Sequence, residues 1–352
     1  MPKVSVVIAA YNRARFLPEC IESVLSQTFQ DFEVLIVDDG STDNTREVVS
    51  AYCPPVKYFH QENQGAPATK NKGIELVSGD YIALLDSDDV LLEDALKKGV
   101  DVLDRWPNVG LSYGQAYIMD EEGHVTELLR PSHCKGSYVR SGKEEIKDLI
   151  LGNYITGSTT MIRRSCFALV GLFNPVFRRG SEDFDMWVRL AKRYDVAYID
   201  SPLAKYRVHH QSLSAGRQVD EVKWAHGLIL RSIFSDNELG NLYDKLKAKA
   251  NYHFYCRLAR IAKSRGDFKT ARGYLLKALR VYPQAAFQLD AMNWQLLWTK
   301  AVLPTSFIDF ARKVKRQLSL LAGREYGRFY DPQKGKDKAL SRSGSECEPR
   351  SK

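Results

Sequence analysis

The stretch ALLDSDDV, residues 83–90, joins an apolar run directly to three carboxylates, Asp86, Asp88 and Asp89. The apolar half has the short, nearly continuous hydrophobic character of a strand that is covered on both faces. Like charges this close raise each other's pKa and repel unless something positive lies among them. The stretch therefore predicts a buried strand with a positive group held at its carboxyl end.

The sequence around this stretch, from the N-terminus to residue 113, alternates strand-like and helix-like segments. We expect strands at Val4–Ala9, Val34–Val37, Val56–Phe59, Tyr81–Leu85 and Val109–Tyr113, and helices at Arg15–Leu25, Thr42–Ser50, Ala66–Val77 and Leu92–Arg105. Such alternation predicts an α/β fold, with a mostly parallel sheet and helices on both faces. Ligands of such sheets bind at the carboxyl ends of the strands.

The rest of the chain is less regular and then becomes helical. We expect a hairpin with MDEEGH (119–124) as its turn, a helix near Glu144–Leu151, a strand near Thr159–Ile162, a helix at Phe184–Arg193, and strands at Val196–Ile199 and Leu203–Val208. From about residue 220 the pattern is helical, and 252–285 resembles one tetratricopeptide unit. Because about three such units are needed to stand alone, a helical hairpin packed on the preceding domain is the favoured interpretation. The polar segment 331–352 is expected to be disordered.

Composition limits the class of protein. The chain has 352 residues, 44% hydrophobic and 27% charged, which is typical of a soluble globular protein. No apolar run reaches the roughly 18–20 residues of a membrane span, and the N-terminus has no signal sequence. Six scattered cysteines without a CxxC pair favour a reducing compartment over a disulfide frame or a zinc site.

Charge is divided unevenly along the chain. Residues 1–240 carry a net charge of −7, and residues 241–352 carry +15. Within the basic part, residues 305–321 place apolar side chains on one helical face and Lys and Arg on the others. This pattern fits an interfacial membrane helix, and it equally fits a helix packed on the domain with a solvated basic face. No nucleic-acid-binding motif accompanies the charge.

The acid cluster itself has three interpretations. An Asp-x-Asp pair at a strand end suits Mg²⁺ or Mn²⁺ that also holds a diphosphate. The same acids could instead face the N-terminal dipole of the next helix. A third alternative is the DxDxV pattern of haloacid dehalogenase phosphatases, with Asp86 as nucleophile, although those enzymes usually carry it on the first strand and here it follows the fourth.

Three other strand ends carry residues suited to a nucleotide. VSVVIAAYN ends in Ala9 and Tyr11, whose ring can stack on a base. IVDDGSTDNT offers Asp38 and Asp39, of which a carboxylate can accept from a uracil N3–H, and Gly40 permits a tight turn. The QGAPATKNKGI loop brings Lys70 and Asn71, and Lys70 suits a phosphate. Each has a structural explanation by itself, but together they favour a nucleotide site.

These motifs, in this order and spacing, resemble those of family 2 glycosyltransferases over about residues 3–215. The resemblance implies the nucleotide-sugar-binding GT-A fold, transfer from a nucleoside diphosphate sugar, a divalent metal at the Asp-x-Asp, and inversion at the anomeric carbon. Most members have Arg where Lys70 stands. The QxxRW signature of processive synthases is absent, and RVHHQSLS stands instead.

The resemblance also assigns roles to individual residues. In GSEDFDMWVRL, Asp183 matches the family's general base, although Ser181 with the following acids could simply cap a helix. In KYRVHHQSLS, His209 matches a position that can join a carboxylate at the metal. Asp88 is the expected metal ligand, and the expected donor contacts are Ala9, Tyr11, Asp38, Asp39, Lys70, Asn71, Asp86 and Ser87.

Taken together, the sequence predicts a GT-A domain at 1–215 and a helical region at 220–330. We expect a metal-dependent hexosyltransferase that uses a nucleotide sugar, with UDP-sugar favoured, and a glycan or lipid-linked acceptor. It would build polysaccharide as a peripheral protein on the cytosolic face of a bacterial inner membrane. The alternative is a non-catalytic nucleotide-sugar-binding or scaffold protein in a glycan assembly complex.

Overall fold

The computed structural model describes residues 1–178, 180–212, 216 and 218–285. Met1–Ala285 form one compact unit. The expected amphipathic segment 305–321 and the expected disordered tail 331–352 lie outside the described residues. Within the described part of the chain, none of the helices combines the length and the apolar character that crossing a bilayer requires.

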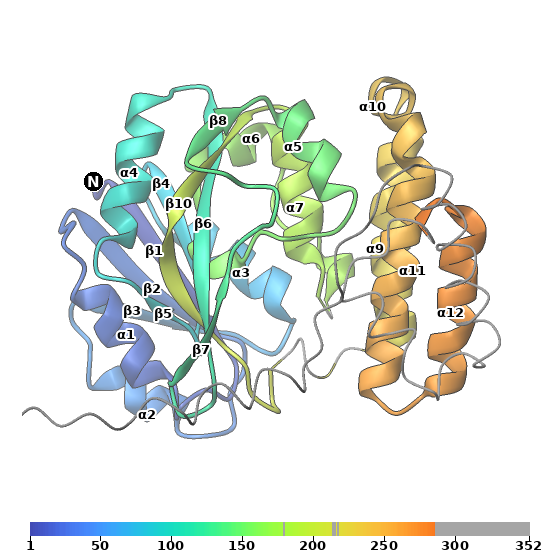
Figure 1. Ribbon diagram of the computed structural model, residues 1–352. Helices are drawn as coiled ribbons and strands as arrows, with labels where there is room; N and C mark the ends of the chain where they lie inside the picture. The colour runs from blue at the N-terminus through green and yellow to red at the C-terminus, as the bar shows by residue number, and fades with distance from the viewer. Residues whose placement is uncertain (179, 213–215, 217, 286–352) are drawn as a thin grey trace, which may run out of the picture. The chain divides into compact units, whose positions relative to one another are not determined.

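A ten-stranded sheet organises this unit, with the order β3-β2-β1-β4-β9-β6-β10-β5 (Figure 1). Strands β1 to β4 are parallel, and so are β6 and β10, whereas the short β9 runs antiparallel between β4 and β6. Strand β7 pairs with β6, and β8 with β10. The strands are β1 (Val4–Ala10), β2 (Phe32–Asp38), β3 (Val56–His60), β4 (Tyr81–Asp86), β5 (Val90–Leu91), β6 (Val109–Met119), β7 (Val125–Leu129), β8 (Tyr138–Arg140), β9 (Met161–Arg163) and β10 (Asp195–Arg207).

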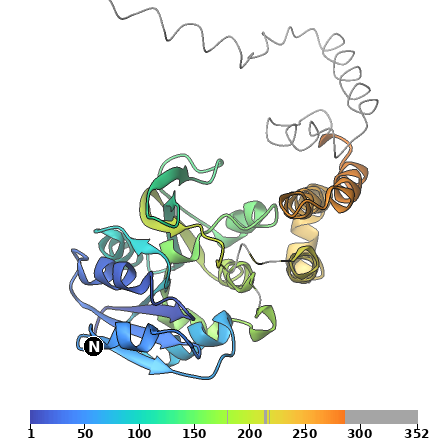
Figure 2. The same cartoon turned by 90° about the horizontal axis from the view of Figure 1, so that it is seen from below.

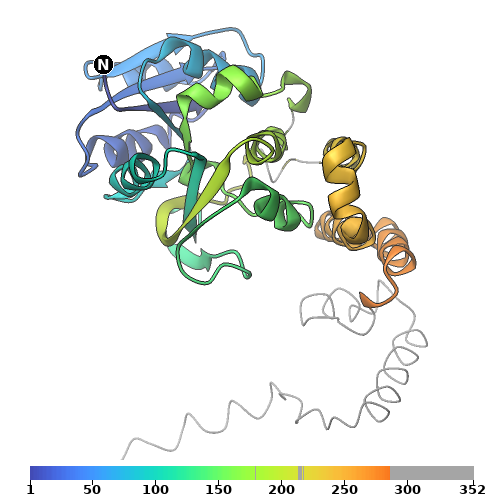
Figure 3. The same ribbon diagram turned by 90° about the horizontal axis from the view of Figure 1, so that it is seen from above.

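Helices cover both faces of the sheet, as Figures 2 and 3 show. Side chains alternate along a strand, so β1 sends Val6 and Ile8 to one face and Val7 to the other. The first face is covered by α1 (Leu17–Leu25), α2 (Thr45–Ser50) and α4 (Ala95–Arg105). The second is covered by α3 (Ala66–Leu76), α5 (Gly142–Leu149), α6 (Phe167–Val170) and α7 (Glu182–Ala191). The predicted α/β fold class is confirmed.

The order of the first four strands indicates where a ligand is expected to bind. The chain passes from β1 to β2 through α1 on one face, and from β3 to β4 through α3 on the other. Strand order therefore reverses between β1 and β4, and this switch point is where open α/β sheets bind ligands. Ala9 lies opposite Asp86 on β4, and Ala10 lies opposite Asp38 on β2. The motifs of three strand ends therefore meet at one edge.

The described residues after the sheet form the α-helices α9 (Val219–Phe234), α10 (Asn237–Tyr243), α11 (Lys247–Ser264) and α12 (Phe268–Val281). The expected hairpin is present as α11 and α12, with Gly266 at φ 78° in the turn and Asp267 accepting from the Thr270 N–H at 3.0 Å. Buried residues of α9, such as Ile229, share one hydrophobic cluster with those of α5 and α7. The Tyr243 hydroxyl donates to the Lys143 carbonyl at 2.6 Å. The helical region therefore packs on the sheet domain.

Some local expectations differ from the structure, such as the helix expected from Leu92, which begins at Ala95. Helix α2 begins at Thr45 rather than Thr42, because the Thr42 N–H donates to Asn12 Oδ1 at 2.8 Å and holds that segment as a loop. The two strands expected after residue 195 are one strand, β10, with register shifts between Ile199 and Pro202 that absorb the irregular SP pair. The hairpin predicted around MDEEGH is confirmed as β6 and β7.

Glu33 ties the amino ends of the central strands together. Its carboxylate accepts from Ser5 Oγ, Lys57 Nζ and the Ser78 N–H, each at 2.8 Å. Burial opposes ionisation, but these hydrogen bonds outweigh it and lower the pKa of Glu33 to about 2. Because the folded-state pKa is depressed, the resulting stabilisation is present above the ordinary pKa of a glutamate and is lost as pH falls through it towards 2.

We expect Glu33→Gln to lower the free energy of unfolding at pH 7 by about 1–3 kcal/mol. The same variant should lose part of the wild-type decline in stability between about pH 4.5 and 2. Urea unfolding at several pH values measures both effects. Glu75→Gln, at an exposed carboxylate paired with Lys72, is the control and should change little. An unchanged pH dependence in Glu33→Gln would contradict the assignment.

Candidate active site

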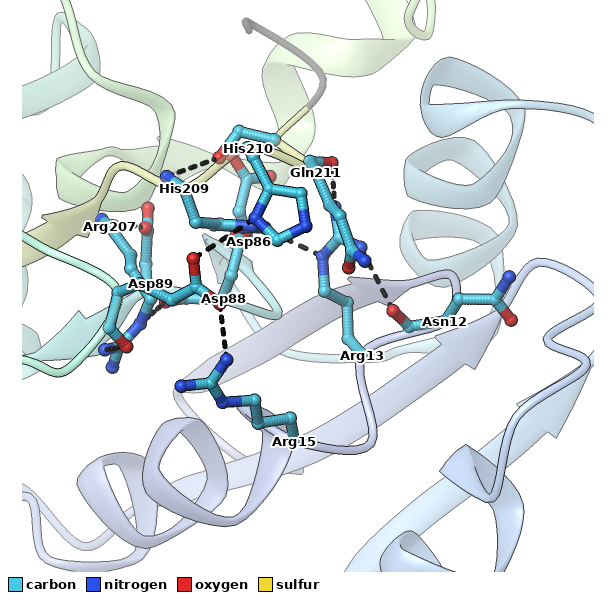
Figure 4. Close-up of polar contacts among 12 residues, drawn as sticks. Asn12, Arg13, Arg15, Asp86, Asp88, Asp89, Arg207, His209, His210 and Gln211 are labelled. Atoms are coloured by element: carbon cyan, nitrogen blue, oxygen red, sulfur yellow. Dashed lines mark hydrogen bonds and ion pairs between the residues drawn. The ribbon is translucent and has the colours of Figure 1, made fainter. Parts of the chain in front are cut away.

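The three acids at the end of β4 and in the loop after it are each matched by a positive group or by hydrogen-bond donors. Asp88 Oδ2 accepts from Arg13 Nε at 3.3 Å and lies 2.9 Å from His209 Nε2 (Figure 4). Asp86 Oδ1 lies 3.5 Å from Lys70 Nζ. The expectation of positive charge among these carboxylates is confirmed, although the groups present are protein side chains.

Asp89 is a structural member of the cluster. It is fully buried and accepts from Ser158 Oγ at 2.5 Å and from the Arg207 N–H at 2.9 Å. Burial, together with the charges of Asp88 and Asp86, raises the pKa of Asp89 well above its usual range. Asp89 therefore fixes the loop and leaves Asp86 and Asp88 to face a ligand.

Arg207 and Arg13 were not identified from the sequence. Arg207 is buried, pairs with Glu19 and donates from Nε to the Asp88 carbonyl at 2.9 Å. Arg13 Nη2 donates to the Gln211 carbonyl at 2.9 Å, so the loop after β1 is joined to the segment after β10. Arg207 lies within KYRVHHQSLS and Arg13 directly follows VSVVIAAYN, so their place beside strand ends was the signal available.

Lys70 lies in a different environment from the one expected. Its ammonium is buried and donates to Glu182 Oε1 at 3.0 Å, with Asp86 on its other side. Burial alone would lower the pKa of Lys70, but the carboxylates of Asp86, Glu182 and Asp183 outweigh it and raise the pKa above its ordinary value. In this structure Lys70 joins the end of β4 to the start of α7, and its contact with a phosphate stays a prediction.

Asn71 forms hydrogen bonds with the backbone of a distant residue. Its Nδ2 donates to the Phe173 carbonyl at 2.8 Å, and its Oδ1 accepts from the Phe173 N–H at 2.8 Å. The nitrogen and the oxygen of the Asn71 side-chain amide therefore both bind the backbone of Phe173, 102 positions away. Asn71 anchors α3 to the segment before α7 in this structure, and its contact with a donor stays a prediction.

Asp38 and Asp39 lie where the sequence predicts that the nucleobase of the donor binds. Asp38 is buried and accepts from the Ser41 N–H at 2.9 Å and the Tyr58 hydroxyl at 2.6 Å. Asp39 accepts three hydrogen bonds from the loop 61–65, two of them at Oδ1 and one at Oδ2. A carboxylate has about four acceptor positions, so one remains on Asp39 for a ligand. The tight turn expected at Gly40 is present, with φ 79°.

Tyr11, Ala9 and Ser87 complete the group of expected donor contacts. The Tyr11 side chain is 45% exposed at the end of β1, as a stacking surface requires. Ala9 is half-buried beside Asp86, and Ser87 is buried. Between the strand ends, the Asn12 N–H donates to Ser41 Oγ at 2.8 Å and joins the first two loops.

Asp183 lies in the first turn of α7. Its Oδ1 accepts from the Phe184 N–H at 2.7 Å, and its Oδ2 accepts from Asn153 Nδ2 at 2.9 Å. The preceding Ser181 has φ 77°, a left-handed conformation that is strained for a residue other than glycine. Ser181 occupies the N-cap position with acids in the first turn, as the capping interpretation expects, but its side chain makes no capping hydrogen bond. Asn153 was not predicted, because nothing local in GNYITGS indicates a partner 30 residues away.

Asp88 and His209 fit a divalent cation. Nδ1 of His209 is buried, and no described residue forms a hydrogen bond with it. Across the described ranges, no group of three or more His, Cys, Asp or Glu side chains gathers to hold a metal. A carboxylate and an imidazole would therefore supply two ligands, and a diphosphate the others, as is usual for Mg²⁺ and Mn²⁺.

Comparison with known proteins places this arrangement in a family. The sequence profile of glycosyl transferase family 2 matches residues 5–170. The glycosyltransferase GlyG of Streptococcus pneumoniae is 31% identical over 247 residues, which cover 64% of this chain and 77% of GlyG. The chain belongs to glycosyl transferase family 2. The predicted family is thereby confirmed, and the phosphatase alternative is wrong.

Other relatives of this family 2 member extend the match. The GalNAc(5)-diNAcBac-PP-undecaprenol beta-1,3-glucosyltransferase of Campylobacter jejuni is 27% identical over 323 residues, 90% of this chain and 98% of that protein. Two glycosyltransferases of Rickettsia felis and Rickettsia conorii are each 31% identical over 60% and 59% of the chain. The chain spans about a third of the length of these rickettsial relatives, 35% and 34%.

Solved structures confirm the GT-A-like fold. The mannosyltransferase PcManGT of Pyrobaculum calidifontis, in complex with GDP-Man and Mn²⁺, superposes with a TM-score of 0.54 at 17% identity, over 92% of this chain and 88% of that one. Residues 1–349 of S. aureus TarS, in complex with UDP-GlcNAc, give a TM-score of 0.52 at 16% identity, over 80% and 91%.

Proposed function

We propose that the chain transfers a sugar, with inversion, from a nucleoside diphosphate sugar to a hydroxyl of a glycan or lipid-linked acceptor. The observation that carries this proposal is the Lys70 ammonium, which lies between Asp86 of the acid loop and Glu182, the residue before Asp183. The buried Lys70 side chain therefore links the loop proposed to hold the donor with the first turn of α7, which carries the proposed general base Asp183.

The donor would lie across the carboxyl ends of β1, β2 and β4. Tyr11 would stack on the base, the remaining acceptor position of Asp39 would take a base N–H, and Asp38 would support that loop through Ser41. A UDP-sugar suits this site because the Asp39 carboxylate can accept a hydrogen bond from uracil N3–H. TarS, which shares the fold, is solved with UDP-GlcNAc. Asp86 and Ser87, with Ala9 beside them, would lie along the ribose and diphosphate.

Asp88 and His209 would hold Mn²⁺ or Mg²⁺. A bound metal would supply Lewis acidity to the leaving diphosphate. PcManGT, solved with Mn²⁺, supports this assignment through its shared fold. Arg13, which contacts the same Asp88 oxygen, would place a second positive charge beside the diphosphate.

Inverting transfer is a single displacement, and the acceptor hydroxyl must lose its proton as it attacks. Asp183 is the candidate base, and hydrogen bonds from Asn153 and from the Phe184 N–H orient its carboxylate. Asn153 is a positioning residue, because its side-chain amide donates to Asp183 Oδ2.

The proposal is tested by incubating the protein with UDP-glucose, UDP-GlcNAc, UDP-galactose and GDP-mannose, with Mn²⁺ or Mg²⁺ and with chelator. We expect release of nucleoside diphosphate from one donor, dependent on metal, and a β-linked product from an α-linked donor by NMR. A product that retains the donor's anomeric configuration would contradict the mechanism, and metal-independent release would contradict the assignment of Asp88 and His209.

Asn153→Ala should reduce turnover about tenfold, because a hydrogen bond to a charged group contributes about 1.5–3 kcal/mol. The KM for the donor should stay near the wild-type value, since the hydrogen bond that Asn153 makes in the site goes to the general base Asp183. Steady-state kinetics separates kcat from KM. Asn174→Ala, which removes a loop-capping amide outside the site, is the control. A raised donor KM with unchanged kcat would place Asn153 in the donor pocket instead.

We further propose a peripheral association with an anionic membrane, on the cytosolic face of an inner membrane. The support is the net charge of +15 in residues 241–352. Vesicles containing anionic lipid should sediment the full chain, less so as salt rises, because exposed charges are screened within about 8 Å at physiological ionic strength. A chain ending at residue 285 should bind less. Equal binding by both chains, or binding that salt does not weaken, would contradict this proposal.

A further inference from the structure

A pocket of 640 Å³ lies between α11 and the segment that follows α5. Its lining includes Asn153 and Phe184 on one side and Lys249, Arg257 and Arg260 of α11 on the other. None of the residues assigned to donor or metal above lines it. The pocket is therefore separate from the nucleotide site.

The pocket is strongly basic along α11. Lys249, His253, Arg257 and Arg260 are spaced by four, four and three residues, so they lie on one face of the helix. The lining contains one carboxylate, Asp148, which is paired with Arg140 at 2.8 Å and with His133 at 3.6 Å. Lys249 and Arg260 therefore line a space in which the one acid is already paired.

Packing does not account for this basic face. The residues with which α11 is buried are a different set, among them Leu258, Ala259 and Ala262, which are fully covered. Lys249 is half-buried and Arg260 is exposed. The helix could keep its packing with neutral polar residues at both positions, so the charges indicate a ligand.

The pocket adjoins the candidate base. Asn153 lines it and also donates to Asp183 Oδ2 at 2.9 Å, and Phe184 is the next residue in the chain. On the donor side, Glu182 contacts Lys70, which contacts Asp86. The base therefore stands between the acid loop and the pocket, which is the place an acceptor must occupy.

We infer that this pocket binds the anionic part of the acceptor, a phosphate-bearing group carried near the hydroxyl that is glycosylated. The inference rests on the proposed function and adds the chemical class of its acceptor. Lys249 and Arg260 are separated by about 16 Å along the helix at 1.5 Å per residue, which is long enough to follow a sugar and a diphosphate. The phosphate could belong to an isoprenoid-linked sugar diphosphate or to a phosphodiester-linked glycan.

The test uses the full chain with UDP and Mn²⁺ at saturation, so that the donor site is filled. Calorimetry measures binding of farnesyl diphosphate, of a glycerol phosphate oligomer and of neutral maltopentaose. We expect one phosphate probe to bind and maltopentaose not to bind. The probe that binds identifies the source of the phosphate.

Lys249→Gln/Arg260→Gln should weaken binding of that probe at least about tenfold, equivalent to about 1.4 kcal/mol. The control is Lys269→Gln/Arg272→Gln, which removes the same charge from exposed positions of α12 outside the pocket. Equal weakening in the control, wild-type affinity in the pocket variant, equal binding of maltopentaose, or no binding of either phosphate probe would overturn the inference. Failure of UDP to bind wild type would instead overturn the proposed function.

Discussion

Asp183→Asn should bind the nucleotide sugar as well as wild type and turn over at least roughly 100-fold more slowly, because a general base typically contributes 10²–10⁴-fold. The amide cannot take the acceptor proton. It can still accept from the Phe184 N–H, so the first turn of α7 should keep its structure. Donor binding should survive because Lys70, which contacts Asp86 of the acid loop, donates its hydrogen bond to Glu182, and Asp183→Asn leaves that link in place.

Calorimetry of donor binding and a transfer assay on one preparation measure both halves of this prediction. Asp185→Asn is the matched control, since it neutralises a carboxylate in the same turn that pairs with Arg189 at 2.8 Å. Near-normal turnover of Asp183→Asn would remove Asp183 from the mechanism. Loss of donor affinity would assign it to the donor pocket.

Asp88→Ala should abolish metal-dependent donor binding. Asp88 is the carboxylate that Arg13 and His209 share, so its removal takes away one proposed metal ligand and releases the other from its partner. A diphosphate entering without the metal would face the remaining carboxylate of Asp86.

Thermal unfolding with UDP-sugar, with and without Mn²⁺, measures this effect. Asp88→Asn keeps the shape of the side chain and tests whether any loss comes from charge rather than from a collapsed loop. Asp101→Ala, at an exposed acid paired with Lys97, is the control. If Asp88→Ala keeps wild-type donor affinity and metal dependence, the metal site lies elsewhere.

The sequence predicted the fold and the edge of the sheet that carries the site. Strands such as Val4–Ala10 and Tyr81–Asp86 have local signals, because residues buried on both faces are continuously apolar and the polar motif begins where burial ends. The meeting of Asp38, Asp86 and Asp88 at one edge then follows from parallel strands. Elements with mixed local signals, such as the Pro-interrupted β10, were less well placed.

The partners of the site residues were not predictable in the same way. Lys70 and Asn71 are adjacent in the sequence, yet Lys70 contacts Glu182 and Asn71 contacts Phe173, more than 100 residues away. A residue type shows which groups it can bind, but only the tertiary structure shows which of them it meets. For the same reason Asn153 and Arg207 were missed.

The most direct test of the central claim is donor binding by the wild-type chain across a panel of nucleotide sugars. A donor at 100 times its Kd should raise the free energy of unfolding by about 2.7 kcal/mol. We predict that one nucleotide sugar stabilises the protein in this way with Mn²⁺ or Mg²⁺ and much less with chelator. If none of them raises the unfolding temperature with either metal, the chain is not a nucleotide-sugar-dependent transferase of the kind proposed.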